Sequence, residues 1–220
     1  MLSRDNHPLA SLRFPSSPEE WQSSPAHLTE EGLEIFDHPV MQRWETRYMA
    51  ELARIAASSG GHVLEIGFGL GLAASFIQQH GVAEHWVVEA NREVFETAER
   101  WAAGLNASIK CVYGFWESVV QEMPAGSFDG ILFDPYPISL DQLHTQRFSF
   151  FEQAHRLLRP GGVFTHYSGE LEFTPEYERK LHTAGFREFA GEQVEVTPPP
   201  GCKYWDEARM LAPAIRKAKA

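Results

Sequence analysis

The stretch His62–Gly71, HVLEIGFGLG, decides the fold of this 220-residue chain. An apolar run is followed by three glycines at alternate positions, Gly67, Gly69 and Gly71, and then by the helical pattern LAASFIQQH. Glycine is needed where a strand turns sharply into a helix and its backbone approaches a ligand closely. The stretch therefore predicts a strand, a ligand-binding turn and a helix. The glycines alone do not identify the ligand, because nicotinamide- and flavin-binding folds use a related turn.

Short apolar runs alternate with helical patterns after this stretch. The apolar runs are HWVVE (85–89), IKCVY (109–113), FDGILFD (128–134) and GGVFTHY (161–167). The helical patterns are REVFETAERWA (92–102), FWESVVQEM (115–123) and FSFFEQAHRLL (148–158). Such alternation predicts a parallel sheet covered by helices on both faces. Two further runs, FREFAGEQVEV (186–196) and KYWDEARMLAP (203–213), flank the turn-forming TPPPG, so the sheet is expected to finish with an antiparallel pair.

The part of the chain before the glycines divides in two. Residues 1–32 carry several prolines and serines, which favour irregular structure. We interpret them as an N-terminal arm, either flexible or a lid in which Trp21 would cap a ligand. Residues 33–220 are expected to form one domain. Within it, VMQRWETRYMAELARIAA (40–57) has apolar residues at helical spacing and predicts a helix that begins at Pro39 and ends at Gly60.

The composition limits the classes of function. The chain is 43% hydrophobic, and no apolar run approaches the roughly 20 residues that span a bilayer. It shows no secretory signal pattern, and its two cysteines, Cys111 and Cys202, do not suggest a disulfide framework, so a cytoplasmic location is expected. The formal net charge of −11 disfavours a nucleic-acid partner and favours a small-molecule substrate. The histidines show no metal-ligand spacing, so no metal is expected.

Acidic residues on either side of the glycines narrow the choice of cofactor. Glu89 ends the second strand about twenty residues after the glycines, where a carboxylate can accept both ribose hydroxyls. The segment Glu65–Gly71 resembles motif I of class I S-adenosylmethionine (SAM)-dependent methyltransferases, in which an acidic residue precedes the turn. FDGILFD and LLRPGGVF (157–164) are similar to the fourth and fifth strands of the same enzymes. The resemblance implies a Rossmann-like α/β fold with a mostly parallel seven-stranded sheet, SAM as cofactor and S-adenosylhomocysteine as product.

The same resemblance implies a set of cofactor contacts. Phe115, Trp116 and Glu117 follow the third strand, where an aromatic face can stack on adenine and Glu117 can accept from its amino group. Core packing is the alternative for Trp116. The residues expected to bind the cofactor are Trp21, Tyr48, Met49, Glu65, Gly67, Gly69, Gly71, Glu89, Ala90, Phe115, Trp116, Glu117 and Asp134.

Longer segments are similar to one methyltransferase family. PVMQRWETRYM (39–49), GGHVLEIGFG (60–69), EHWVVE (84–89), FDGILFD (128–134) and PPGCKY (199–204) resemble guanidinoacetate N-methyltransferase, and the likeness runs from about residue 33 to the last strand. It implies that Glu45 and Asp134 hold a planar guanidinium, whose pKa exceeds about 12, by paired charge-assisted hydrogen bonds. Asp134 would act as general base and Glu45 as clamp. Without the resemblance, Glu45 would be interpreted as a solvated helix carboxylate.

The expected substrate site differs from the family pattern in two places. Pro135 stands where the family has threonine, and Ser168-Gly169-Glu170 stands where backbone amides receive the carboxylate of guanidinoacetate. A glutamate beside a carboxylate repels it, so we expect a different guanidino compound, such as arginine or agmatine, unless Glu170 faces solvent. The residues expected to bind the substrate are Met41, Glu45, Asp134, Tyr136, Ser168, Gly169 and Glu170.

One alternative function is left open by the residues. Asp134-Pro135-Tyr136-Pro137 is similar to the Asp-Pro-Pro-Tyr loop with which amino-methylating enzymes hold an exocyclic amine of a nucleic-acid base. The alternative is therefore an amino-group methyltransferase that acts on another small molecule or on such a base, although the acidic surface disfavours a phosphate backbone. We expect a monomer or a homodimer.

Overall fold

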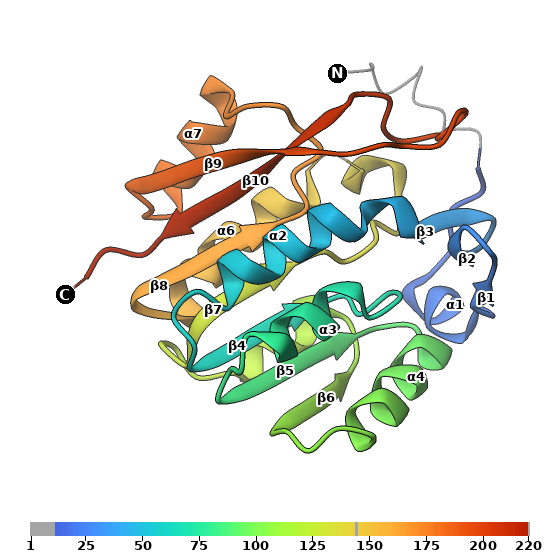
Figure 1. Cartoon of the computed structure of the whole chain (residues 1–220), viewed down its shortest axis with the longest axis horizontal. Helices are drawn as coiled ribbons and strands as arrows, with labels where there is room; N and C mark the ends of the chain where they lie inside the picture. The colour runs from blue at the N-terminus through green and yellow to red at the C-terminus, as the bar shows by residue number, and fades with distance from the viewer. Residues whose placement is uncertain (1–11, 144, 220) are drawn as a thin grey trace.

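The computed structural model describes residues 12–143 and 145–219, and its centre is a seven-stranded sheet (Figure 1). The strand order is β6-β5-β4-β7-β8-β10-β9. The parallel strands are, in their order in the sheet, β6, β5, β4, β7 and β8. Strand β10 runs antiparallel to both β8 and β9, which confirms the predicted fold class. The bounds are β4 (His62–Ile66), β5 (Glu84–Glu89), β6 (Ile109–Tyr113), β7 (Phe128–Phe133), β8 (Leu158–His166), β9 (Glu188–Glu195) and β10 (Arg209–Arg216).

Helices cover both faces of this sheet, as Figure 1 shows. Alternation along β4 supplies both faces, because Leu64 and Ile66 pack in one apolar cluster while Val63 packs in the other. One face carries α2 (Thr46–Ala56), α3 (Leu72–Gln79) and α4 (Arg92–Ala103). The other carries α5 (Trp116–Val119), α6 (Gln146–Leu157) and α7 (Pro175–Thr183), with the short turns η4 (Val120–Glu122) and η5 (Leu140–Gln142) between them in the chain.

A small second sheet lies at the carboxyl ends of the parallel strands (Figure 1). It consists of β1 (His27–Leu28), β2 (Gly32–Ile35) and β3 (His38–Gln42), all antiparallel, and it follows the short helix α1 (Pro18–Ser23). Composition favoured irregular structure before residue 33. Ser17, however, caps α1 by accepting from the amide of Glu20, and Pro18 occupies the first helical turn.

The helix predicted from Pro39 is wrong in its first part. Pro39 and Val40 belong to β3, and α2 begins only at Thr46, after the 3₁₀ turn η3 (Arg43–Glu45). The residues Phe36 and Asp37 adopt positive φ angles of 57° and 61°, which reverses the chain and lays β3 along β2. The hydrogen bonds of this pairing override the apolar spacing that favoured a helix.

The glycine turn and the ends of β5 and β7 meet at one edge of the main sheet. Gly67 follows β4, Glu89 ends β5 and Asp134 follows β7. Because parallel strands place their carboxyl ends together, this edge is where such sheets bind ligands. None of the helices in the described ranges is long and apolar enough to cross a membrane.

Candidate active site

Two cavities open at this edge of the sheet, and they meet at Asp134. The smaller measures about 630 Å³, including the part open to solvent, and adjoins the glycine turn. The larger, about 2040 Å³ including the part open to solvent, extends from β7 toward the segment between β8 and α7. The residues that line both are Val40, Asp134, Pro135, Tyr136 and Gln146. A molecule in one cavity can therefore contact a molecule in the other beside the Asp134 side chain.

The glycine turn forms one wall of the smaller cavity. Gly67, Gly69 and Gly71 have φ angles of 89°, 54° and 71°, which side chains rarely adopt. A Cβ on Gly67 would lie 2.3 Å from the carbonyl oxygen of Asp134, and one on Gly69 would lie 3.0 Å from the Met41 side chain. Gly67 and Gly69 line the cavity, whereas Gly71 does not. The bare backbone thus lets β7 and β3 approach the turn, as well as a ligand.

Glu89 faces the smaller cavity from the end of β5. Its carboxylate accepts hydrogen bonds from the amides of Phe68, at 3.0 Å, and Asn91, at 2.8 Å. Burial raises the pKa of Glu89 above its usual value, although these amides oppose the rise. A carboxylate that lines the cavity is a suitable acceptor for the ribose hydroxyls of a ligand. Ala90 lies beside it on the same wall.

The residues expected around adenine line the far side of the smaller cavity. Phe115, Trp116 and Glu117 all belong to its wall. Trp116 also packs edge-on against Phe133 and Phe150, at ring distances of 5.4 and 5.2 Å, so it contributes to the core as well. Its indole N–H is buried without a partner among the described residues. Both interpretations of Trp116 therefore fit its position, in the core and in the wall of the cavity.

Trp21 forms the outer wall of the smaller cavity. Only 4% of it is exposed, and its ring stacks on Tyr136 with centroids 5.6 Å apart and planes 4° apart. The side-chain amide of Asn91 donates to the carbonyl of Trp21 at 2.9 Å, which fastens α1 to the start of α4. The tryptophan is thus positioned to cap a ligand. Residues 1–11 of the expected arm lie outside the described part of the chain, and its action as a lid stays a prediction.

Four residues expected to contact the cofactor line neither cavity: Tyr48, Met49, Glu65 and Gly71. Met49 is buried in the core, and Tyr48 donates to the carbonyl of Leu211 at 2.8 Å. The Glu65 carboxylate lies 2.9 Å from Nε2 of His85, and burial raises its pKa. Glu65 stands two residues before Gly67, and its charge raises the pKa of Asp134. Direct contact of these residues with the cofactor stays a prediction.

Glu45 lies at the inner end of the larger cavity, with only 3% of its surface exposed. Its Oε1 accepts from the amide of Gln42 at 2.7 Å and from the hydroxyl of Tyr204 at 2.6 Å. Burial raises the pKa of Glu45 to about 7, against the opposing effect of these donors. Sequence reasoning assigned no role to Tyr204, although it ends the quoted segment PPGCKY. The solvated helix carboxylate considered from sequence does not match this position.

Asp134 is half-buried where the two cavities meet. Its amide donates to the carbonyl of Ile66 at 2.8 Å, which extends the pairing of β7 with β4 by one residue. Within the described part of the chain, no donor bonds to its carboxylate. Burial raises the pKa of Asp134 well above its usual range, and the charges of Glu45 and Glu65 raise it further. The carboxylate is therefore basic and available to a donor on a ligand.

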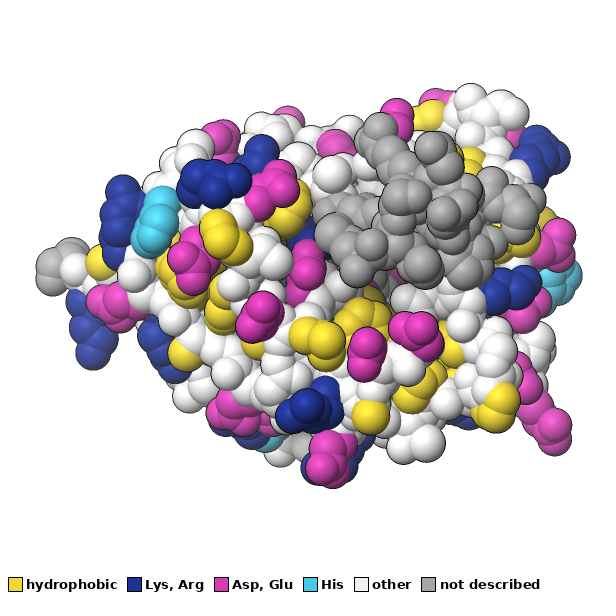
Figure 2. All heavy atoms as spheres, turned by 90° about the horizontal axis from the view of Figure 1, so that it is seen from above, with side chains coloured by type: hydrophobic (Ala, Val, Ile, Leu, Met, Phe, Trp, Pro, Cys, Tyr) yellow, Lys and Arg dark blue, Asp and Glu magenta, His cyan; other side chains and the backbone are white. Residues whose placement is uncertain are grey.

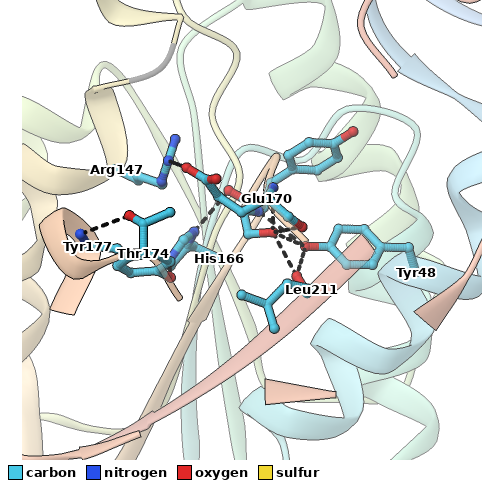
Figure 3. A network of polar contacts seen from close by, with 9 residues as sticks. Tyr48, Arg147, His166, Glu170, Thr174, Tyr177 and Leu211 are labelled. Atoms are coloured by element: carbon cyan, nitrogen blue, oxygen red, sulfur yellow. Dashed lines mark hydrogen bonds and ion pairs between the residues drawn. The ribbon is translucent and has the colours of Figure 1, made fainter. Parts of the chain in front are cut away.

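The segment after β8 forms the opposite side of the larger cavity, and Figure 3 shows its contacts. The amide of Ser168 donates to the Tyr48 hydroxyl at 3.1 Å, and the amide of Glu170 donates to Oγ of Ser168 at 3.2 Å. The Glu170 carboxylate lies 2.6 Å from Nη2 of Arg147, which is 8% exposed. Arg147, which the sequence analysis did not single out, offsets the charge of Glu170. Glu170 by itself is therefore not sufficient to repel a carboxylate on the substrate.

The remaining residues expected to bind substrate divide between the cavities. Tyr136 lines both, and its hydroxyl lies 2.9 Å from Nδ1 of His38. Gly169 lines the larger cavity, whereas Met41 lines only the smaller one, next to Gly69. Among residues 12–143 and 145–219, no three His, Cys, Asp or Glu side chains gather closely enough to hold a metal ion.

Comparisons with known proteins find similar sequences and similar folds. A model of the guanidinoacetate N-methyltransferase family matches residues 15–218. Protein arginine N-methyltransferase 2 of Aspergillus oryzae is 32% identical over 178 residues, which cover 77% of this chain and 42% of that protein. The protein of the same name from Yarrowia lipolytica is 28% identical over 138 residues, 59% of this chain and 28% of that protein. The chain thus spans less than half the length of these curated relatives.

Solved structures show the same fold. Spermidine synthase from Thermotoga maritima superposes with a TM-score of 0.62 over 87% of this chain and 71% of that one. The two sequences are only 16% identical, so this likeness concerns the arrangement of strands and helices.

Proposed function

Because the chain belongs to the guanidinoacetate N-methyltransferase family, we propose that it is a SAM-dependent enzyme that methylates a guanidino nitrogen of a small molecule. The observation that carries the proposal is the pair Glu45 and Asp134, two carboxylates at the inner end of one cavity. Asp134 also belongs to the second cavity, which holds the glycine turn. Substrate and methyl donor would therefore meet at Asp134.

The smaller cavity fits an adenosyl cofactor. Its wall combines the bare backbone of Gly67 and Gly69, the Glu89 carboxylate and the aromatic faces of Phe115 and Trp116. When bound there, SAM supplies an electrophilic methyl group on a positively charged sulfur. The acidic side chains around the junction favour this positive charge.

Two carboxylates that line one cavity suit a guanidinium by their charge. This planar cation presents paired N–H donors and stays protonated near neutral pH because its pKa exceeds about 12. The hydroxyl of Tyr204 and the amide of Gln42 hold Oε1 of Glu45, which orients that carboxylate toward the cavity. Glu45 then clamps the guanidinium by charge-assisted hydrogen bonds.

Asp134 accepts the proton that the reaction releases. A guanidinium nitrogen that gains a methyl group must lose one proton, because its lone pair is delocalised over the cation and becomes nucleophilic only as the proton leaves. The Asp134 carboxylate has no donor of its own among the described residues, and its pKa is raised by burial and by the neighbouring carboxylates. Most of the acceleration would come from positioning and electrostatics, and the stack of Trp21 on Tyr136 helps to exclude water.

Calorimetric titration tests the proposal directly. Guanidinoacetate, arginine, agmatine and guanidinopropionate would each be titrated into protein saturated with S-adenosylhomocysteine. We expect at least one to bind, and Asp134→Asn to abolish that binding, while Glu96→Gln on the exposed side of α4 leaves it unchanged. If the adenosyl product binds and every guanidine fails, the guanidino assignment is refuted and the cofactor site is retained.

A protein substrate is a second candidate, favoured by the names of the curated relatives. Protein arginine N-methyltransferase 2 carries a name that places the methyl group on arginine in a protein. An arginine side chain presents the same guanidinium to Glu45 and Asp134. Incubation of a cell extract with tritiated SAM, followed by separation of proteins from small molecules, distinguishes the two. Label in the small-molecule fraction alone supports our proposal, and label in protein alone refutes it.

The location and assembly of the enzyme are proposed on simpler grounds. Cys111 and Cys202 are free thiols, and we propose that the protein is located in a reducing cytoplasm. The described residues of the proposed site all belong to one chain, and we propose a monomer or a homodimer.

A further inference from the structure

The outer part of the larger cavity has a charge pattern that the reaction itself does not need. Beyond Glu45 and Asp134, its described lining includes Glu170 and Glu172 after β8, and Asp206 and Glu207 before β10. Arg147 is the basic residue among the described lining residues, and its guanidinium lies 2.6 Å from Glu170. Glu172, Asp206 and Glu207 are exposed at the mouth of the cavity. The mouth is therefore acidic, even after Arg147 is counted against Glu170.

Two backbone donors of the segment after β8 are already engaged. The amide of Ser168 donates to Tyr48, and the amide of Glu170 donates to Oγ of Ser168. The hydroxyl of Ser168 in turn donates to the carbonyl of Leu211 at 2.7 Å (Figure 3). A carboxylate held by the amides of Ser168 and Glu170 would have to displace these bonds. It would also lie among the carboxylates of the mouth, whose charge repels it.

The formal net charge of the whole chain, −11, has the same sign as the charge of the mouth. Figure 2 shows one face of the molecule, on which acidic, basic and hydrophobic side chains are interspersed. The long-range field thus also favours the approach of a cation.

We propose that the substrate is a guanidino compound with a second positive charge at the end remote from the reacting guanidinium, an inference that rests on the proposed function. The guanidinium lies between Glu45 and Asp134, and the second cation lies at the mouth near Glu172, Asp206 and Glu207. The second charge is either an amine of the same small molecule or a basic residue next to an arginine in a peptide. The chemistry of recognition is the same in both cases.

Three compounds that carry four carbons on the guanidine test the role of the second charge: agmatine, which ends in an ammonium, butylguanidine, which ends in a methyl group, and 4-guanidinobutyrate, which ends in a carboxylate. We expect kcat/KM to fall in this order, with agmatine preferred over butylguanidine by about tenfold, because each exposed ion pair contributes only weakly. The preference should shrink as salt is raised, since salt screens exposed charges. Equal kcat/KM for the three compounds would overturn the proposal.

A variant of the mouth residues tests whether the preference for agmatine comes from these residues or from the net charge of the chain. The combined variant Glu172→Gln, Asp206→Asn and Glu207→Gln should lower kcat/KM for agmatine to that for butylguanidine and leave butylguanidine unchanged. The control Glu96→Gln, Glu99→Gln and Glu188→Gln removes the same charge from exposed positions on α4 and β9 and should keep the preference. A mouth variant that keeps the full preference contradicts the proposal.

Further outcomes distinguish a second charge on a small molecule from one on a peptide. They also distinguish a failure of this inference from a failure of the proposed function. An arginine peptide with flanking lysines that is methylated faster than agmatine, while its glutamate-flanked counterpart is not, places the second charge on a peptide. This result supports the second charge and refutes the small-molecule substrate of the proposed function. Methylation of butylguanidine and 4-guanidinobutyrate at the rate of agmatine refutes the second charge but keeps the guanidino function. If no guanidine is methylated, the proposed function fails together with this inference.

Discussion

Replacement of Glu45 by glutamine is expected to stabilise the fold at alkaline pH while it removes guanidine binding. Burial raises the pKa of Glu45 from 4.5 to about 7, so the folded protein holds this proton more tightly than the unfolded chain does. The ionised carboxylate therefore reduces the stability as pH rises from about 4.5 to about 7. At 1.36 kcal/mol per pKa unit, the cost above this range is about 3 kcal/mol. Glutamine carries no charge, and its oxygen still accepts from Gln42 and Tyr204.

Denaturant unfolding of the wild type and of Glu45→Gln measures this effect. The stability difference between the two should grow from near zero at about pH 4.5 to about 3 kcal/mol at about pH 8 in favour of the variant. Glu96→Gln, an exposed control, should show no such growth. A difference that does not change with pH, or a variant that is less stable throughout, would refute the burial of an ionisable Glu45. The same variant should bind no guanidine in the calorimetric assay.

Three further predictions concern neighbouring residues. Tyr204→Phe removes the donor that holds Glu45 ionised, so the pKa of Glu45 should rise and the acid limb of kcat/KM should move to higher pH by about one unit; an unmoved limb would show that the hydroxyl does not act on Glu45. Asp134→Asn should abolish methyl transfer and leave S-adenosylhomocysteine binding within about twofold in calorimetry; substantial turnover by this variant would exclude Asp134 as the proton acceptor. Trp21→Ala should weaken S-adenosylhomocysteine binding by about tenfold through loss of the aromatic wall, whereas unchanged affinity would show that Trp21 caps no ligand.

The sequence by itself determined the main sheet and the edge at which its glycine turn lies. The glycines after HVLEI and the alternation of apolar runs with helical patterns are local signals, and both were sufficient for the parallel sheet and its ligand-binding edge. The position of Asp134 followed from the same logic, because the end of a parallel strand lies at that edge. Glu45 was identified only through resemblance, since nothing in its local pattern distinguishes it from a solvated carboxylate.

Tertiary structure decided the contacts between residues far apart in the chain. Pairing with β2 turned Pro39 and Val40 into a strand, although their spacing favoured a helix. Burial of Glu45 depends on Tyr204, 159 positions away, and the charge of Glu170 is offset by Arg147 on α6. A pattern in sequence reports periodicity and local preference, whereas burial, pKa and ion pairing depend on which distant side chains share the same space. For that reason the reactivity of the site and the charge at its mouth became visible only in the folded chain.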